Sequence, residues 1–238
     1  MSEPRTQTRR QRVEAKEQAI IAAAREIFQE HGFEKTKIAE IAKLAGVAEG
    51  TVYLYFENKN ALILAVASEF YDRLTRDAAD GIRDLNDTVA RLEFLARHHF
   101  ERVAREWMLL AQAINPFKAV SDYRETEAYQ LNRTYVEVFD QVIRDGINRG
   151  DIRDDISLSV MRDVFYGGIE YGTRTMRLRS AKADIDDIDN IVGDFMKVFA
   201  AGMFVTSTAA VTKEQRSLDQ IASRLEKIAG RLEAVDKN

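Results

Sequence analysis

Side chains that commonly carry catalysis or bind metals are scarce in this sequence. It has no cysteine, which excludes disulfides, thiolate metal sites and a cysteine nucleophile, and its only histidines are His31, His98 and His99. His98 and His99 are neighbours, so on a helix their rings point about 100° apart and cannot converge on one metal ion. No Ser-His-Asp arrangement, Glu-x-x-His pair or glycine-rich phosphate loop is readable. We therefore expect no enzyme activity, no metal and no cofactor.

The remaining chemistry is that of cations and exposed polar groups, which could bind a polyanion locally. Lysine and arginine number 35 against 39 acidic residues, and the net charge of −4 gives no general attraction for nucleic acid. Residues 1–60, however, hold ten basic and nine acidic side chains, so the acidic excess lies in the rest of the chain. This sign favours a DNA-contacting head on an acidic body, with residues 1–12 as a disordered basic arm.

The elements that would position these groups are all helical. Two prolines in 238 residues, together with abundant Ala, Leu, Ile, Glu and Arg, indicate an all-α fold. Apolar spacing predicts a helix over 13–31, a short helix from a cap at Thr36 to Leu44, and a third over 48–56. A long fourth helix follows Asn58. The pattern then predicts helices over 86–114, 122–148, 157–178 and 187–209.

The stretch from Thr36 to Phe56 has the parts that a helix-turn-helix requires. Ala42 is small where two helices would cross, and Gly46 can adopt the positive φ of the turn. Val52 and Phe56, four residues apart, are expected to face inward and hold the third helix down. The outer face would then carry the N-terminal residues of a recognition helix, which meets the major groove of DNA.

These residues resemble the N-terminal signature of the TetR family of transcriptional repressors, over roughly residues 15–65. The matching positions are Gly32-Phe33, Thr36, Ile41-Ala42, Ala45-Gly46-Val47, Gly50-Thr51-Val52-Tyr53, Tyr55-Phe56, Lys59 and Ala61-Leu62. The resemblance implies phosphate contacts by Lys37, Thr51, Tyr55 and Lys59. It implies base contacts by Glu49, Gly50 and Tyr53.

Two positions in the recognition helix depart from the family's common pattern. Ala48 stands where many members have serine, which removes a helix cap, and Glu49 stands where Lys or Arg is frequent. A carboxylate repels phosphate but can accept a hydrogen bond from cytosine N4, so Glu49 is a candidate specificity element. The alternative is that Glu49 only stabilises the helix N-terminus electrostatically.

The body, residues 61–210, is expected to hold an effector-binding and dimerisation domain. Large side chains at helical spacing are more often core than ligand contacts, but TetR-like bodies bind their effector between the middle helices. The candidate ligand-binding residues are Phe94, His98, Trp107, Met108, Gln112, Tyr135, Phe139, Phe165, Ile169 and Thr173. One of the two adjacent histidines is expected to face inward.

A second, looser resemblance is to the FadR-type branch, which responds to fatty acyl-CoA. It rests on the run 46–56 with Asn58-Lys59, and on Phe165-Tyr-Gly-Gly-Ile-Glu before an aspartate-rich loop. This resemblance implies an apolar tunnel and cations for the CoA phosphates. Arg105, Arg174 and Arg177 are the candidates, the alternative being a solvated helix face.

Glycines near residue 166 point to close helix packing. Gly167, Gly168 and Gly172 lie in a predicted helix, where each glycine lowers helix stability by about 1 kcal/mol relative to alanine. A compensating contact is therefore expected. TetR-family dimers pair two such helices into a four-helix bundle, here 157–178 and 187–209; room for a ligand is the alternative. Residues 211–238 form a short apolar seam that predicts an extra amphipathic helix, packed either on its own subunit or on a second copy.

Together these patterns predict a homodimeric DNA-binding repressor on a palindromic operator, released by a small apolar effector that is a candidate acyl-CoA. The alternative is a helical module whose head contacts a protein partner. No segment has the length and hydrophobicity of a membrane span or a leader, so a cytoplasmic protein without a membrane partner is expected.

Overall fold

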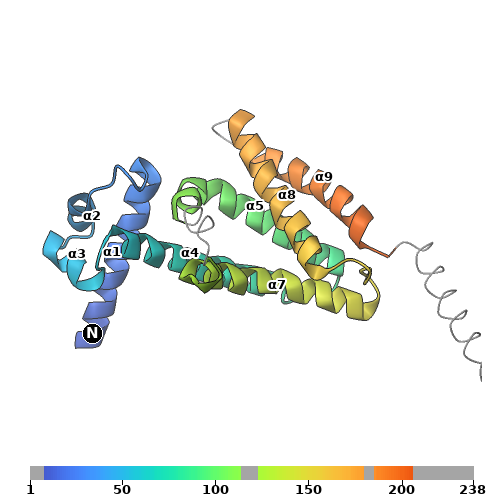
Figure 1. Ribbon diagram of the computed structural model, residues 1–238, viewed down its shortest axis with the longest axis horizontal. Helices are drawn as coiled ribbons and strands as arrows, with labels where there is room; N and C mark the ends of the chain where they lie inside the picture. The colour runs from blue at the N-terminus through green and yellow to red at the C-terminus, as the bar shows by residue number, and fades with distance from the viewer. Residues whose placement is uncertain (1–7, 114–122, 180–184, 206–238) are drawn as a thin grey trace, which may run out of the picture.

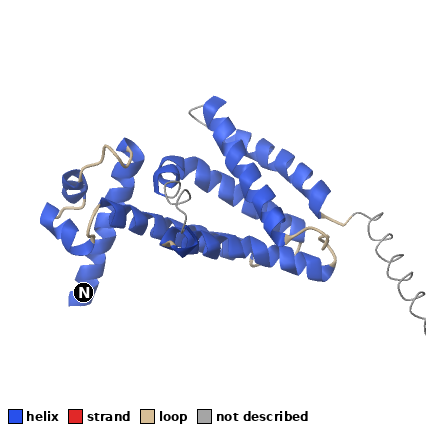
Figure 2. Ribbon diagram, viewed as in Figure 1, coloured by secondary structure: helices blue, strands red, loops and turns tan. Residues whose placement is uncertain are grey.

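The computed structural model describes residues 8–113, 123–179 and 185–205, and every regular element in those ranges is helical (Figure 2). The sequence prediction of an all-α fold is confirmed. The predicted C-terminal helix over 211–238 and the arm residues 1–7 lie outside this part of the chain. Within it, no helix is both long and apolar enough to cross a membrane. The elements are α1 (Arg9–His31), α2 (Ile38–Leu44), α3 (Glu49–Tyr55), α4 (Lys59–Ile82), α5 (Thr88–Ala113), the 3-10 turn η1 (Tyr123–Glu125), α7 (Glu127–Arg149), α8 (Leu158–Arg179) and α9 (Ile185–Met203).

Helices α1, α2 and α3 form a head at one end of the molecule (Figure 1). Helix α1 begins at Arg9 because Thr8 caps it: the Thr8 hydroxyl accepts from the backbone N–H of Gln11, whose side chain accepts from the Thr8 N–H. The predicted start at residue 13 was therefore wrong. The arginines at positions 9, 10 and 12 belong to α1 and not to a disordered arm.

The turn between α2 and α3 follows the predicted chemistry, but the start of α2 does not. Gly46 has φ +68°, a backbone conformation that residues other than glycine rarely adopt. The predicted place of Gly46 in the turn is confirmed. Thr36 does not cap α2. Its buried hydroxyl donates to the carbonyl of Gly32 at 2.7 Å, and Lys37 is the capping residue instead.

Helix α4 belongs to both the head and the body (Figure 1). It begins at the predicted place, with the Asn58 side chain accepting from the backbone N–H of Ala61. Near its far end, which is at Ile82, the ring of Phe94 in α5 packs so closely on Gly81 that a Cβ on this glycine would overlap it. Gly81 therefore allows α4 and α5 to approach each other.

The remaining body helices differ from their predicted bounds where local contacts end them. Helix α7 begins at Glu127 and not near 122, because Thr126 caps it by accepting from the N–H of Tyr129. Helix α9 ends at Met203 and not near 209, because Phe204 pairs with Ile152 in an isolated antiparallel bridge. The end of α9 is thereby fixed to the loop between α7 and α8. Helices α8 and α9 pack side by side (Figure 1).

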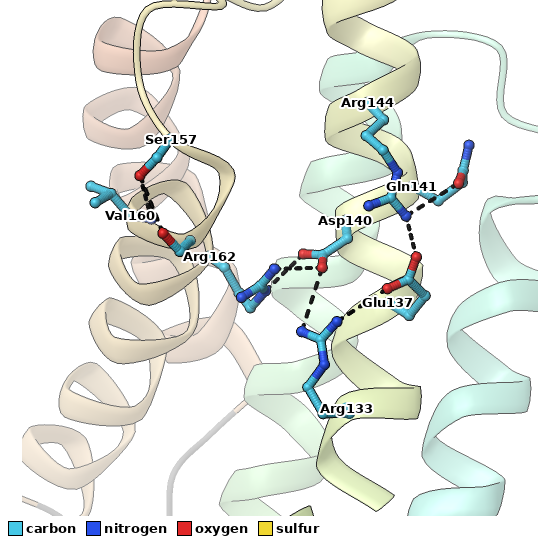
Figure 3. A network of polar contacts seen from close by, with 9 residues as sticks. Arg133, Glu137, Asp140, Gln141, Arg144, Ser157, Val160 and Arg162 are labelled. Carbon is cyan, nitrogen blue, oxygen red and sulfur yellow. Dashed lines mark hydrogen bonds and ion pairs between the residues drawn. The ribbon is translucent and has the colours of Figure 1, made fainter. Parts of the chain in front are cut away.

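One carboxylate lies inside the body. Asp140 of α7 is 1% exposed, and both its oxygens accept from the Arg162 guanidinium of α8, at 2.7 and 2.5 Å (Figure 3). Arg133 approaches the same carboxylate at 3.6 Å. The pKa of Arg162 is raised by its hydrogen bonds to this carboxylate, so the guanidinium stays charged. Because a buried charge without a partner is strongly unfavourable, this pair fixes how α7 and α8 pack.

We predict that Arg162→Ala lowers the free energy of unfolding by about 3 kcal/mol, because it leaves the Asp140 carboxylate buried with only the more distant Arg133. Urea denaturation followed by circular dichroism measures this. Lys197→Ala is the matched control, because it breaks an ion pair with Asp194 in which both side chains are 78% exposed, and little change is expected. Equal, small effects of the two substitutions would contradict a structural role for the buried pair.

Candidate nucleic-acid interface and body core

Helix α3 lies on the surface of the head and is held there by two buried side chains. Val52 is 1% exposed and Phe56 is 7% exposed, so the predicted inward face is confirmed. On the outer face Tyr53 is half exposed, Leu54 is 83% exposed, and Glu49 and Gly50 are exposed. Ala48 provides no side-chain cap, as its residue type predicts. The exposed face of α3 therefore carries the Glu49 carboxylate, the Tyr53 phenol and Gly50, which has no side chain.

The other predicted DNA-contacting residues border this face. Lys37 is exposed at the start of α2, and its backbone N–H donates to the Glu40 carboxylate at 3.3 Å. Thr51 and Tyr55 are half-buried, and the Tyr55 ring packs against the core of the head. Their contacts with DNA stay predictions.

Lys59 has a second set of partners within the head. Its ammonium donates to the carbonyls of Phe33 at 2.7 Å, Glu34 at 3.3 Å and Thr36 at 3.3 Å, and it lies 4.5 Å from the centre of the Phe33 ring. An ammonium has three protons, and each has a carbonyl here. Lys59 thus fixes the loop between α1 and α2 to the start of α4. A phosphate contact would have to replace one of these bonds.

The predicted effector residues separate into three groups in the structure. Five are fully buried where α7 and α8 pack: Tyr135, Phe139, Phe165, Ile169 and Thr173. Two lie on α5 beside α4: Phe94 and His98, whose rings stack at 5.9 Å. The side chains of the other three, Trp107, Met108 and Gln112, lie outside the described set.

The buried group forms a continuous aromatic core and not a set of isolated side chains. The rings of Phe139 and Phe165 are 4.6 Å apart, and Phe165 also contacts Phe195 and Phe199 of α9. The Thr173 hydroxyl donates to the carbonyl of Ile169, so it is already satisfied within its own helix. Any ligand between α7 and α8 would have to move these rings aside.

His98 occupies a partly buried position at the junction of α4 and α5. Neither ring nitrogen has a hydrogen-bond partner among the described residues. Burial, and next the Arg102 guanidinium, lower the pKa of His98 to about 4, so the ring is neutral at pH 7.

His99, and not His98, faces the centre of the body. It is 6% exposed, and its Nδ1 lies 3.0 Å from the Tyr135 hydroxyl. The expectation that one histidine faces inward is confirmed, but His99 was missing from the predicted effector residues, as were Tyr71 and Tyr166. The spacing of Leu92, Leu95, Ala96, His99 and Phe100 carries the signal that could have found His99, because it places that ring on the buried face of α5.

Helix α3 is short and exposed, follows a tight turn at Gly46, and is held to the head by the buried Val52 and Phe56. Such a head on a helical body is typical of helix-turn-helix transcriptional regulators. The model of bacterial regulatory proteins of the TetR family matches residues 20–66, and that of the YsiA-like protein C-terminal region matches residues 68–198, more than half of the chain. The chain belongs to the TetR family of transcriptional regulators and has a YsiA-like C-terminal region. The resemblance read from the sequence is confirmed.

Known relatives agree with this assignment. The fatty acid metabolism regulator protein of Bacillus subtilis is 25% identical over 173 residues, which cover 73% of this chain and 89% of that protein. The transcriptional regulator UidR of Escherichia coli K12 is 29% identical over 158 residues, 62% of this chain and 76% of UidR. The fold is similar to that of Bacillus subtilis FadR in complex with stearoyl-CoA, with a TM-score of 0.67, 23% identity, and coverage of 78% of this chain and 98% of that one. These relatives are regulators and not enzymes.

We predict that Lys59→Met lowers the free energy of unfolding by about 2 kcal/mol, because three carbonyls lose a charged donor. The same variant should leave the salt dependence of binding to a mixed-sequence DNA duplex nearly unchanged. Lys37→Ala is the comparison: its ammonium is exposed, so its loss should reduce the salt slope by about one without affecting stability.

Chemical denaturation and fluorescence anisotropy at several salt concentrations measure the two quantities. If Lys59→Met reduced the salt slope by about one while stability stayed the same, Lys59 would be a phosphate contact and not the residue that holds the loop.

Proposed function

We propose that the protein is a homodimeric repressor that binds a palindromic operator through α3 and releases it when a small apolar effector, of the acyl-CoA class, binds the body. The observation that carries this proposal is the exposed face of α3, with Tyr53 half exposed and Leu54 83% exposed above the buried Val52 and Phe56. Large apolar and aromatic side chains in such a position favour a surface that meets a partner.

The chemistry of the head supports DNA as that partner. Glu49 and Tyr53 would reach base edges in the major groove, where a carboxylate accepts from cytosine N4 and a phenol has a hydroxyl to offer. Lys37, Thr51 and Tyr55 would contact phosphates on either side. Such contacts position the head, whereas the base contacts select the sequence. Gly50, around which the structure leaves open space, would let the backbone come close to the DNA.

A second copy is proposed to cover an apolar stripe on α8. Val160, Val164, Tyr171 and Leu178 are 49, 48, 70 and 79% exposed, at spacings that keep them near one face, and Val198 of neighbouring α9 is 78% exposed. One recognition helix contacts too little DNA for tight binding. Two heads about 34 Å apart would read successive major grooves of a palindrome.

Two of the three α8 glycines, Gly168 and Gly172, make close contacts within the chain, whereas Gly167 faces open space. A Cβ on Gly168 would come within 2.8 Å of the Phe195 ring, and one on Gly172 within 3.3 Å of the Phe100 ring, so both are needed inside the subunit. A Cβ on Gly167 would meet nothing within 4 Å. The helix-propensity cost of Gly167 is therefore unexplained by its own subunit, which supports close approach by a second copy at that point.

The apolar effector is supported by the aromatic core and by the relatives. The core of the body contains packed phenylalanines from α7, α8 and α9, and the related FadR is a stearoyl-CoA complex. Arg105 and Arg174 are exposed on α5 and α8, where they could meet CoA phosphates. Binding would release DNA only if the effector prefers a body conformation whose head spacing does not fit the operator.

We predict that the protein selects a palindrome from a random DNA library, with two half-sites about one helical turn apart. Val164→Asp should make the protein monomeric and weaken binding to the selected duplex by at least tenfold, because a charge in the interface opposes pairing. Val89→Asp, at an exposed valine of α5 outside the stripe, is the matched control and should bind like wild type. Sedimentation and anisotropy report the two effects.

Palmitoyl-CoA at micromolar concentration should then release the wild-type protein from the selected duplex. Recovery of no enriched sequence, together with binding that does not depend on salt, would favour a head that contacts protein. A polar metabolite that releases DNA where palmitoyl-CoA does not would contradict the acyl-CoA effector.

A further inference from the structure

Each of four body helices contributes one polar aromatic side chain to a single buried cluster. These are Tyr71 of α4, His99 of α5, Tyr135 of α7 and Tyr166 of α8, which we call the polar quartet. Ring centres are 5.6 Å apart for His99 and Tyr135, 4.8 Å for His99 and Tyr166, 5.6 Å for Tyr135 and Tyr166, and 6.3 Å for Tyr71 and Tyr135. The quartet therefore lies where these four helices meet.

The hydroxyls of the quartet are not required to fill the core. Phenylalanine has nearly the same volume and would avoid the unfavourable burial of polar atoms. Tyr135 is satisfied by His99 at 3.0 Å. The Tyr166 hydroxyl is also buried. The Tyr135 hydroxyl approaches it as a donor, but not with the geometry of a normal hydrogen bond, and the Tyr166 proton has no acceptor within the described ranges of the chain. A buried hydroxyl of this kind requires a reason for its presence.

The surroundings of Tyr166 indicate the ligand that would use this hydroxyl. Its ring packs against those of Phe139 and Phe165 at 5.7 and 5.2 Å, so one side of the quartet continues into the apolar core. Burial raises the pKa of Tyr166 above its usual range, so the phenol stays protonated and acts as a donor. An apolar chain would suit the phenylalanines, and an acceptor oxygen would suit the phenol.

We propose that the Tyr166 hydroxyl, positioned by His99 and Tyr135, is the specificity-determining donor to an acceptor oxygen on an otherwise apolar effector. This inference rests on the proposed function, in which the body binds such an effector. In an acyl-CoA the oxygen would be either the thioester carbonyl or a keto or hydroxyl group on the chain.

The test compares wild type with Tyr166→Phe and with Tyr129→Phe. Tyr129 of α7 is half-buried and lies outside the quartet, the head and the α8 stripe, so this variant also loses one phenol hydroxyl. Release from the selected operator duplex is titrated with palmitoyl-CoA, with its thioether analogue S-hexadecyl-CoA, which lacks the carbonyl, and with 3-ketohexadecanoyl-CoA. Melting temperature and DNA affinity without effector are measured for each protein.

For wild type, the half-release concentration should be about tenfold lower for a ligand that presents the oxygen than for one that lacks it, as expected for one hydrogen bond. Tyr166→Phe should abolish that preference, whereas Tyr129→Phe should retain it. Loss of preference between palmitoyl-CoA and S-hexadecyl-CoA identifies the thioester carbonyl. Loss of preference between 3-ketohexadecanoyl-CoA and palmitoyl-CoA identifies the chain oxygen.

A stability readout separates recognition from a structural role. Because Tyr166→Phe removes a buried hydroxyl whose proton has no acceptor among the described residues and whose contact with Tyr135 is not a normal hydrogen bond, its melting temperature should be equal to or higher than that of wild type, and its DNA affinity should be unchanged. A lower melting temperature with the ligand preference retained would make Tyr166 a structural residue and overturn the inference.

The same titrations distinguish this inference from the proposed function. If wild type is released by acyl-CoA ligands but Tyr166→Phe shows the same preferences, the donor role of Tyr166 is wrong and the repressor remains. If none of the three ligands releases wild type from the operator, the acyl-CoA effector fails, and the inference fails with it.

Discussion

The position of the head depends on helix α4, which is shared by both parts of the molecule. At its first residue, Lys59 binds three carbonyls of the loop between α1 and α2, so the start of the helix is fixed to the head. Near the end of α4, Gly81 lets the Phe94 ring of α5 approach closely. Asp77 of α4 also forms an ion pair with Arg102 of α5. Because one continuous helix carries both sets of contacts, the head cannot turn without moving α4 against the body.

The body combines an apolar core with a few buried polar groups, each of which needs a particular partner. Phenylalanine rings fill space but tolerate many arrangements, whereas the Asp140 carboxylate requires the Arg162 guanidinium. The ion pair therefore fixes the register of α7 and α8, and the polar quartet lies between those helices and α4. A ligand that displaces rings in this region would act on the same helix that holds the head, which is the physical basis proposed for release.

Much of the head followed from local rules, and less of the body did. Gly46, Val52 and Phe56 were predicted because a turn needs positive φ and a short helix needs inward anchors four residues apart. The partners of Lys59 were missed because they lie more than twenty residues away in sequence. His99 was missed for a similar reason: adjacent histidines are equivalent by type, and only the apolar periodicity of α5 distinguishes them. The starts of α1 and α7 were predicted several residues from their observed positions, because composition alone does not show that Thr8 and Thr126 cap these helices.

The proposed release from DNA requires that an effector in the body changes the spacing of two heads. The sequence has no cysteine, so Gln29→Cys on the exposed surface of α1 gives one spin label per subunit. Pulsed electron–electron distance measurements on the operator complex should give one narrow distribution, set by heads about 34 Å apart. Saturating palmitoyl-CoA should displace that distribution as the DNA dissociates. An unchanged distance on release, or no dipolar coupling in either state, would contradict the account.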